Sequence, residues 1–391
     1  MNIAFFCIPA HGHTNPTLAV VRELTARGHT VRYYTTEAFR AKVEAAGAVF
    51  VPFDTEAARP GMTAADGARL GSDLAFSTKL IVDLTLAADD WLSRELTAHR
   101  PDVIAGDSMA FWAKLAAKKH GIPFVSSTTT FAFNRFSAKV IGQNGAGFLQ
   151  FLLAQPRINR QLKRLRAAGY AVKSVFDIIA NDNETETVVY TSPDFQPCAD
   201  TFSEKYHFVG PLLRPAQSSF EKLPGRSLIY ISLGTVNNDA LPFYRACLAA
   251  FGGDPRFQLV LSAGTQTDLA ALGPIPENCT VRASVDQMAV LDCADVFLTH
   301  CGMNSASEGL WHGLPLVLYP QTPEQHGVAN RVAALGAGVP LTDPSADGIR
   351  RAVEAALTDP SYRENAQKLA DSFRRCGGAA EAADAIEHAA N

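Results

Sequence analysis

Short apolar segments alternate with helical segments along this chain, and the same alternation occurs in both halves. Apolar runs bounded by turn-forming residues favour buried strands, and their alternation with helices predicts α/β domains with parallel sheets. In the first half we expect strands at 2–9, 31–35, 49–53, 102–106 and 124–127, with helices at 16–27, 39–46, 79–99 and 111–120. In the second half we expect strands at 227–232, 258–262, 279–282, 296–299 and 316–319.

Pro, Gly and Ser concentrate between residues 208 and 224 without regular spacing, which marks an interdomain linker. We therefore divide the chain into a Rossmann-like domain at 1–207, the linker at 208–224 and a second Rossmann-like domain at 225–375. The predicted architecture is two doubly wound domains facing a cleft. Residues 376–391 form a helix with no strand after it, and we expect this helix to pack back over the folded domains.

The composition indicates a large core and limits the classes of partner. Of 391 residues, 47% are hydrophobic, and 35 basic against 39 acidic residues give a net charge of −4. Because neither sign forms a long run, we expect neither nucleic acid nor an anionic membrane surface as a main partner. No segment is apolar over the length of a membrane span, so we expect no stable membrane insertion. The sequence leaves monomer and dimer open.

Seven scattered cysteines, without metal-binding or disulfide-framework spacing, favour reduced thiols. The first residues carry no basic leader before their apolar run, which fits a first strand better than a signal peptide. We therefore expect a cytoplasmic protein.

The segment FLTHCGMNSASEGLWHGLPLVLYPQTPEQ, residues 297–325, has the pattern of a strand, a Gly turn, a short helix, a strand and a polar loop. Around Gly302 the turn leads into a helix opened by Asn304 and Ser305. The start of that helix presents unpaired N–H groups and the positive end of the helix dipole. With His300 beside it, the sequence predicts an anion site here, and a diphosphate is the ligand that suits it best.

A second group of polar residues follows the first predicted strand, at an edge where open α/β sheets bind ligands. The loop PAHGHTNP contains His11 and His13, and Pro16 suits the first turn of the next helix. Asp107 also follows a strand, and with Ser108 beside it the alternative role of Asp107 is to cap the next helix. Two histidines at this spacing could bind zinc, but no third ligand is near, so we predict no metal site.

The sequence HCGMNSASEG followed by PQTPEQ resembles the donor-binding signature of UDP-dependent glycosyltransferases with the GT-B fold. Together with HGHTNP, it makes the chain similar to the bacterial macrolide-type members. The resemblance implies that the first domain binds the acceptor, that the second binds the nucleotide sugar, and that the C-terminal helix bridges onto the first. It also implies an inverting transfer of a hexose from a UDP-sugar, UDP-glucose first, to a hydroxyl of an apolar small molecule such as a macrolide, a flavonoid or another phenolic.

The same resemblance gives roles to single residues. His13, in an H-x-x-P pattern with Pro16, is the general base, and Asp107 orients its ring. His11 lies outside that pattern and is a turn or pocket-wall residue. Because the helix dipole and His300 take the leaving-group charge, no metal and no cofactor is needed besides the sugar donor. The donor-binding residues are Ser232, Gly234, Thr235, Val285, Gln287, His300, Gly302, Asn304, Ser305, Glu308, Glu324 and Gln325.

Some donor-binding residues have a second interpretation. Ser305 and Glu308 match the S-x-x-E pattern of a capping box, which competes or coexists with a role of Glu308 at the ribose. Glu324 and Gln325 supply the acceptor and donor groups that sugar hydroxyls require, with a solvated loop as the alternative.

The residues expected around the base depart from the pattern of many relatives. Ser284 and Asp286 stand where those relatives have an aromatic residue and Pro, so the base has no large ring to stack on. The sequence therefore predicts the diphosphate of the donor more firmly than it distinguishes uridine from thymidine.

Two alternatives to UDP-sugar transfer stay open. A dTDP-sugar-dependent natural-product glycosyltransferase would share the mechanism and differ in its donor. A nucleotide-sugar epimerase or a non-transferring binding protein would need no acceptor, and the pair of His13 and Asp107 argues against a pure binder. Residues 54–71 and 131–180 carry no pattern that identifies the acceptor.

Overall fold

The computed structural model describes residues 1–53, 73–137, 147–181, 183–234 and 238–391, and it divides into two compact units. The first unit is Met1–Leu212 together with Cys376–Asn391, and the second is Leu213–Arg375. One division falls inside the expected linker and the other where the expected C-terminal helix begins. Residues 208–212 belong to the first unit, where the amides of Val209 and Gly210 donate to carbonyls of Val189 and Thr191.

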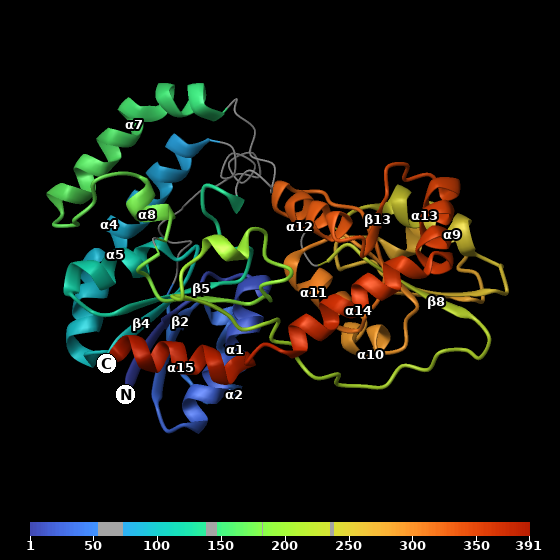
Figure 1. Cartoon of the computed structure of the whole chain (residues 1–391), viewed down its shortest axis with the longest axis horizontal. Helices are drawn as coiled ribbons and strands as arrows, with labels where there is room; N and C mark the ends of the chain where they lie inside the picture. Colours follow the sequence, from blue (N-terminus) through green and yellow to red (C-terminus); the bar gives the residue numbers. More distant parts are fainter. Residues whose placement is uncertain (54–72, 138–146, 182, 235–237) are drawn as a thin grey trace. The chain divides into compact units, whose positions relative to one another are not determined.

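In the described part of the first unit, seven parallel strands form one sheet (Figure 1). They are β1 (Asn2–Phe6), β2 (Thr30–Thr35), β3 (Val49–Pro52), β4 (Val103–Asp107), β5 (Phe124–Thr128), β6 (Thr187–Val189) and β7 (Tyr206–Phe208). Their order across the sheet is β3-β2-β1-β4-β5-β6-β7, so the direction of winding reverses between β1 and β4. At such a switch point the loops on the two sides diverge and leave room for a ligand at the carboxyl ends of the strands.

Alternate residues of β1 enter two hydrophobic clusters, one on each face of the sheet. Ile3 and Phe5 pack with residues of one helical layer, and Ala4 and Phe6 pack on the opposite face, as the two-residue period of a strand requires. The helices are α1 (His11–Ala26), α2 (Arg40–Ala45), α4 (Leu74–His99), α5 (Phe111–His120), α7 (Gly147–Ala167) and α8 (Phe176–Ile179), with short 3₁₀ turns at Glu37–Phe39 and Ala199–Thr201.

The second unit repeats this plan with a six-stranded parallel sheet in its described residues. The strands are β8 (Ser227–Ser232), β9 (Phe257–Ser262), β10 (Cys279–Arg282), β11 (Val296–Thr299), β12 (Leu316–Leu318) and β13 (Gly338–Pro340). Their order is β10-β9-β8-β11-β12-β13, which puts the switch point between β8 and β11. The helices are α9 (Leu241–Phe251), α10 (Gln287–Leu291), α11 (Met303–Trp311), α12 (Pro323–Ala334), α13 (Ala346–Thr358) and α14 (Pro360–Arg374), with a 3₁₀ turn at Leu269–Leu272.

The last helix, α15 (Gly378–Ala390), belongs to the first unit and packs beside α1 (Figure 1). Ala382 and Ile386 enter the core on that side of the sheet. Arg27, at the end of α1, pairs through Nη1 with Asp384 at 2.6 Å and with Glu387 at 2.9 Å. The chain therefore leaves the first unit, builds the second and returns to the first.

Local structure departs from the predictions in several places. Helix α1 begins at His11 rather than Pro16, because the amide of Thr14 already bonds to the carbonyl of Ala10. Strands β6, β7 and β13 were not predicted, since each has three residues and is too short to show a period. Within the described residues, every helix is too short or too polar to cross a bilayer.

Candidate active site

His13 and Asp107 meet at the switch point of the first sheet. Asp107 is the last residue of β4, and His13 lies in the first turn of α1, directly after the neighbouring strand β1. Nδ1 of His13 lies 2.7 Å from Oδ2 of Asp107. The Asp107 side chain is fully buried, while that of His13 is 17% exposed. The ring is thus held by a buried carboxylate and still reaches the surface.

The two oxygens of Asp107 have separate partners. Oδ2 faces His13, and Oδ1 accepts a hydrogen bond of 2.9 Å from the amide of Met109. The next helix begins at Phe111 with Ala110 at its N-cap position, so Asp107 stabilises the preceding turn and is not the helix cap. The alternative assignment of Asp107 as a helix cap is therefore wrong.

Thr129 completes the surroundings of the His13 ring. It follows β5, is 3% exposed, and its hydroxyl lies 2.9 Å from Nδ1 of His13. An ionised carboxylate can only accept hydrogen bonds, so the proton on Nδ1 belongs to the ring and points toward Asp107. This tautomer leaves Nε2 as the basic nitrogen of His13.

His11 lies apart from this pair. Its ring contacts that of Phe39, with centroids 5.0 Å apart, and its Nδ1 lies 3.4 Å from Nζ of Lys42. Burial, with the Lys42 charge, lowers the pKa of His11. In the ranges that the structure describes, no three His, Cys, Asp or Glu side chains gather as metal ligands.

At the switch point of the second sheet, His300 is packed between two glycines. Ser232 ends β8 and lies opposite Thr299, the last residue of the neighbouring strand β11. A Cβ atom on Gly234 would lie 2.6 Å from Cε1 of the His300 ring, and one on Gly302 would lie 2.6 Å from Nε2. Gly234 also has a φ of +79°, which L side chains rarely adopt. Only glycine fits at both places.

Helix α11 starts directly after this turn. Gly302 is its N-cap residue and has no side chain to cap the helix, and Asn304 and Ser305 lie in the first turn. Cys301, between His300 and Gly302, is a buried non-glycine residue with a φ of 64°. Such a strained residue persists only where its surroundings fix it, and these residues cluster at functional sites. The first N–H groups of a helix have no acceptor within the helix, so the start of α11 places hydrogen-bond donors directly after His300 and Cys301.

The His300 ring is neutral at ordinary pH. Burial lowers its pKa to about 4, and the backbone of Ser232 opposes that change without reversing it. Nδ1 of His300 is buried and has no hydrogen-bond partner among the described residues. Leaving such a group unpaired costs on the order of 1–3 kcal/mol. This cost at a helix start is the kind of feature that a binding site tolerates.

A hydrogen-bonded chain runs beside α11. The hydroxyl of Tyr230 donates to Oε1 of Gln287 at 3.0 Å, and Nε2 of Gln287 donates to Glu308. Burial raises the pKa of Glu308, against the lowering effects of Gln287 and Arg214. Since Gly302 is the N-cap, Ser305 is the third helical residue and the predicted capping box of Ser305 with Glu308 is wrong.

Asp286 fixes the beginning of the second unit to this region. Its Oδ2 accepts from the amides of Gln217 at 2.6 Å and Ser218 at 2.9 Å, and its Oδ1 lies 3.0 Å from Nη1 of Arg214. These contacts lower the pKa of Asp286, although burial alone would raise it. Half-buried Val285 is held in the loop just before α10.

Glu324 and Gln325 lie in the first turn of α12 and not in a loop, and Glu324 is exposed to solvent. Thr322 and Gln325 form a capping box, in which Oε1 of Gln325 accepts from the amides of Gln321 at 2.8 Å and Thr322 at 3.2 Å. This role leaves the amide NH₂ of Gln325 as the group available for recognition. Thr235, another predicted donor-binding residue, lies outside the described residues.

The sequence has close relatives over nearly its whole length. It is 33% identical to the NDP-glycosyltransferase YjiC of Bacillus licheniformis, covering 99% of this chain and 97% of the relative. It is 34% identical to the demethyllactenocin mycarosyltransferase of Streptomyces fradiae, with 99% and 86% covered, and 31% identical to the oleandomycin glycosyltransferase of Streptomyces antibioticus, with 99% and 90% covered. The chain belongs to the bacterial macrolide-type glycosyltransferase family. The profile of the erythromycin biosynthesis protein CIII-like C-terminal domain also matches residues 257–387 of this glycosyltransferase.

Solved structures agree with the family. This chain matches the structure of the kitacinnamycin glycosyltransferase with a TM-score of 0.85 and 31% identity. It matches the structure of the calicheamicin glycosyltransferase CalG4 with a TM-score of 0.83 and 29% identity. Both matches cover 99% of this chain and 98% of the other. The predicted GT-B fold with two Rossmann-like domains is confirmed. So is the prediction of an enzyme, a glycosyltransferase of the natural-product type.

Sequence reasoning missed three residues around the sites of this glycosyltransferase. Thr129 follows a strand next to β4, so the rule that selected Asp107 could have found it. The sequence contains no signal for Cys301, because no residue pattern predicts a left-handed backbone at a non-glycine residue. Asp286 was noted only for the absence of Pro, and its contacts with residues about 70 positions away are not visible in sequence.

Proposed function

We propose that this glycosyltransferase moves a hexose from a UDP-sugar, UDP-glucose first, to a hydroxyl of an apolar small molecule with inversion at the anomeric carbon. The observation that carries the proposal is the hydrogen bond between His13 Nδ1 and the buried Asp107 carboxylate. A histidine held in this tautomer has its basic nitrogen at Nε2, and histidine is the side chain that most often acts as a general base.

In the reaction, Nε2 of His13 takes the proton of the acceptor hydroxyl as that oxygen forms a bond to the anomeric carbon. The bond between the anomeric carbon and the diphosphate oxygen breaks on the opposite face, and UDP leaves with the electron pair. Asp107 stabilises the imidazolium that forms, because the carboxylate lies 2.7 Å from the protonated Nδ1.

The start of α11 is our candidate for the diphosphate. A helix N-terminus favours an anion through its free N–H groups and its dipole, and a neutral His300 adds a donor without a competing carboxylate. Asn304 and Ser305 lie in the same first turn. We propose that these groups take the leaving-group charge and that the reaction needs no metal or cofactor.

The remaining polar groups suit the sugars. The carboxylate of Glu308, oriented by Gln287, is proposed to accept from the ribose hydroxyls. Glu324 and the NH₂ group of Gln325 are proposed to bind the hexose, one as acceptor and the other as donor. Val285 and Gln287 are proposed to contact the base.

The relatives support a small-molecule acceptor and leave the donor open. Two of them are by name an oleandomycin glycosyltransferase and a demethyllactenocin mycarosyltransferase, which favours an apolar natural-product acceptor. The mycarosyltransferase, at 34% identity, is named for a sugar other than glucose, and a dTDP-sugar is our second candidate donor. The seven cysteines form no disulfide in the described structure, which favours a reducing cytoplasm as the location.

The test is release of UDP from UDP-glucose with a phenolic acceptor, compared with the same phenol methylated at its hydroxyl. We expect release only with the free hydroxyl, and a β-linked product identified from its anomeric coupling by NMR. Substituting dTDP-glucose changes the nucleoside, because it adds a methyl group to the base and removes the ribose 2′-hydroxyl. Substituting UDP-galactose changes the transferred sugar alone. Binding of UDP without any acceptor-dependent release would favour the binding protein, and conversion of the sugar without acceptor would favour the epimerase.

A further inference from the structure

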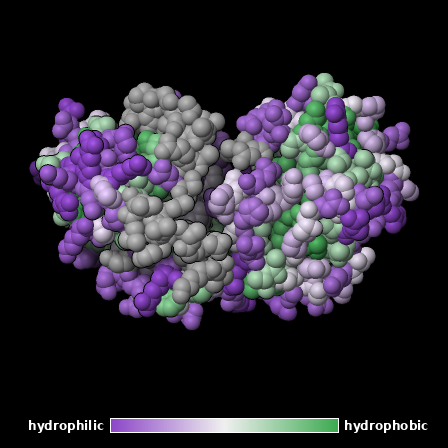
Figure 2. Space-filling view, turned by 90° about the horizontal axis from the view of Figure 1, so that it is seen from above, coloured by the Kyte–Doolittle hydropathy of each residue, from purple (hydrophilic) through white to green (hydrophobic). Residues whose placement is uncertain are grey.

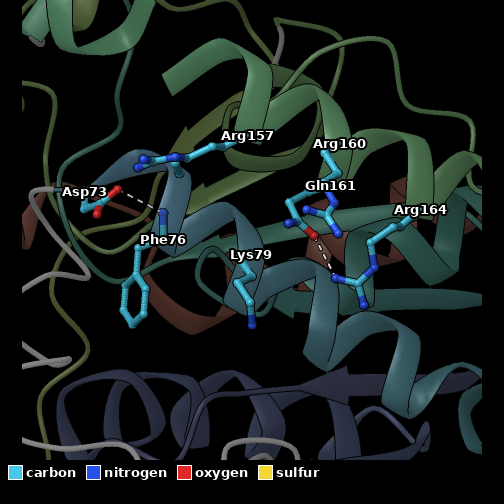
Figure 3. A pocket seen from close by; sticks show the side chains of 8 residues that line it. Asp73, Phe76, Lys79, Arg157, Arg160, Gln161 and Arg164 are labelled. Carbon is cyan, nitrogen blue, oxygen red and sulfur yellow. Dashed lines mark hydrogen bonds between the residues drawn. The ribbon is translucent and has the colours of Figure 1, made fainter. Parts of the chain in front are cut away.

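A pocket outside both switch points lies between α4 and α7 of the first unit. Its volume is about 420 Å³. Figure 3 shows its lining side chains, which come from the first half of α4 and from α7. The lining residues are Asp73, Ala75, Phe76, Lys79, Arg157, Arg160, Gln161 and Arg164. None of these residues has a role in the proposed transfer.

Apolar packing holds the two walls of the pocket together. Val82 of α4 and Ile158, Leu162 and Leu165 of α7 are buried in one hydrophobic cluster, which also includes Ala75 of the pocket lining. The arginines at 157, 160 and 164 follow the spacing of one helix face, next to the face that carries this cluster. The pocket therefore exists without a ligand and does not need to be assembled by one.

The charges at one end of the pocket are compensated. Nζ of Lys79 lies 2.6 Å from Oδ2 of Asp83, and Nη1 of Arg164 lies 2.6 Å from Oδ1 of the same carboxylate. Arg164 also donates to Gln161 at 2.7 Å (Figure 3). Asp73, the one acidic lining residue, caps α4 by accepting from the amide of Phe76.

The charges of Arg157 and Arg160 are not compensated. Neither guanidinium has an ion pair with any carboxylate of the described residues. The sequence of α7 contains five basic residues between 157 and 166 and no acidic residue from 147 to 167. Like charges three and four positions apart on a helix repel one another, so α7 carries an electrostatic cost that an anion would remove. Figure 2, which views the molecule from the side on which α7 lies, shows hydrophilic residues over this part of the first unit.

We propose that this pocket binds a phosphate group through Arg157 and Arg160. A guanidinium matches a tetrahedral oxyanion in charge and can donate two parallel hydrogen bonds, and two of them suit a doubly charged phosphate. Phe76 and Ala75 provide apolar surface for the group that carries the phosphate. The phosphate can belong to a free small molecule or to a lipid headgroup, and the inference does not depend on the transfer reaction.

The experiment compares two double variants of the full-length protein. Arg157→Gln/Arg160→Gln removes the unpaired charges of the pocket. Lys163→Gln/Arg166→Gln removes the same charge from the same helix at residues that do not line the pocket. Both pairs are exposed, so both variants should fold, which circular dichroism would verify.

Hydrogen–deuterium exchange with inorganic phosphate gives a local readout that separates this pocket from the proposed diphosphate site. We expect protection of peptides from 74–99 and 154–167, an apparent dissociation constant raised at least about tenfold by the pocket variant, and little change with the control. Vesicles containing phosphatidic acid, whose phosphomonoester can carry two charges, test the lipid source, with phosphatidylcholine vesicles as the neutral control. Binding to either source that only the pocket variant loses supports the proposal. Equal losses in both variants, or no protection by phosphate and vesicles alike, would overturn it.

Discussion

His13 and His300 each follow a strand at the switch point of a parallel sheet, one in each unit. Their surroundings differ. His13 lies 2.7 Å from a buried carboxylate, and its side chain remains 17% exposed. His300 has no carboxylate partner among the described residues and is packed against Gly234 and Gly302. It is buried enough that its pKa falls to about 4.

This difference separates two kinds of chemistry on one topology. A carboxylate partner favours the charged form of an imidazole and suits a ring that gains and loses a proton. Burial without such a partner keeps the ring neutral, which suits a fixed donor beside a helix N-terminus. The sheet determines where a ligand can lie, and the side chains at its edge determine what happens to that ligand.

Of the substitutions that test this difference between the two histidines, replacing His13 with Ala should have the largest effect on turnover. We expect turnover to fall on the order of a hundred- to ten-thousand-fold, because the acceptor hydroxyl loses its base. The measurement is acceptor-dependent UDP release at saturating donor. Affinity for UDP, measured by calorimetry, should stay within about twofold, since the donor groups belong to the other unit. Unchanged turnover would remove His13 from the mechanism, and a parallel loss of UDP affinity would contradict the separation of roles.

Replacing Gly234 with Ala should instead weaken the binding of UDP. The new Cβ would lie 2.6 Å from the His300 ring, so the ring or the loop must move. We expect UDP to bind at least about tenfold more weakly, an effect within the range of overpacking costs. Calorimetric titration with UDP measures it.

Gly253→Ala is the matched control for this change. Gly253 has a φ of +76°, close to the +79° of Gly234, but a Cβ there meets nothing within 4 Å. Both variants should lose on the order of 1–2 kcal/mol of stability from the left-handed backbone. Only Gly234→Ala should lose UDP affinity, and equal losses in both would show that contact with His300 is unimportant.

The buried His300 also predicts how stability depends on pH. The unfolded chain protonates this histidine as the pH falls below about 6.5, whereas the folded protein does so only near 4. Between these values the unfolded state binds more protons, so stability is complete above about pH 6.5 and decreases toward pH 4. From pH 7 to pH 5 the loss due to His300 should be about 2 kcal/mol.

Urea unfolding of the protein at pH 7 and pH 5 measures that loss. In His300→Asn the difference between the two pH values should shrink by about this amount, whatever the variant does to stability at pH 7. His326→Asn is the control, because His326 is exposed on α12. An unchanged pH difference in His300→Asn would mean that the ring is not buried neutral.

The features that sequence alone predicted are those that depend on local pattern. The turn around His300 and the positions of His13 and Asp107 follow from strands that end in polar residues, a signal carried within a few positions. Local pattern did not predict which segment of the second unit forms a capping box. Ser305 with Glu308 and Thr322 with Gln325 both match the pattern, and only the second pair forms one. Gln287, 21 positions before Glu308, engages that carboxylate, and such a distant contact leaves no trace in the local sequence.

Substitution of Thr129 should have the smallest effect on turnover among these predictions, and it tests how the His13 ring is held. Both Asp107 and the Thr129 hydroxyl reach Nδ1 of His13, at 2.7 and 2.9 Å, but Nδ1 has one proton to donate. The charged carboxylate is the stronger acceptor, so Thr129 is a secondary partner that limits rotation of the ring. Thr129→Val should lower turnover about fivefold, the value of one ordinary hydrogen bond, and Thr129→Ser should restore it.

The pH profile of turnover distinguishes positioning from simple packing around Thr129. If the hydroxyl positions the ring, Thr129→Val should move the acidic limb of the profile, while Asp107→Asn should cause a much larger loss because an amide can donate to Nδ1 and reverse the tautomer. A Thr129→Ser variant as impaired as Thr129→Val, with an unmoved profile, would show that the methyl group rather than the hydroxyl matters. The first switch point would then depend on the pair of His13 and Asp107 alone, as the second depends on His300 and its glycines.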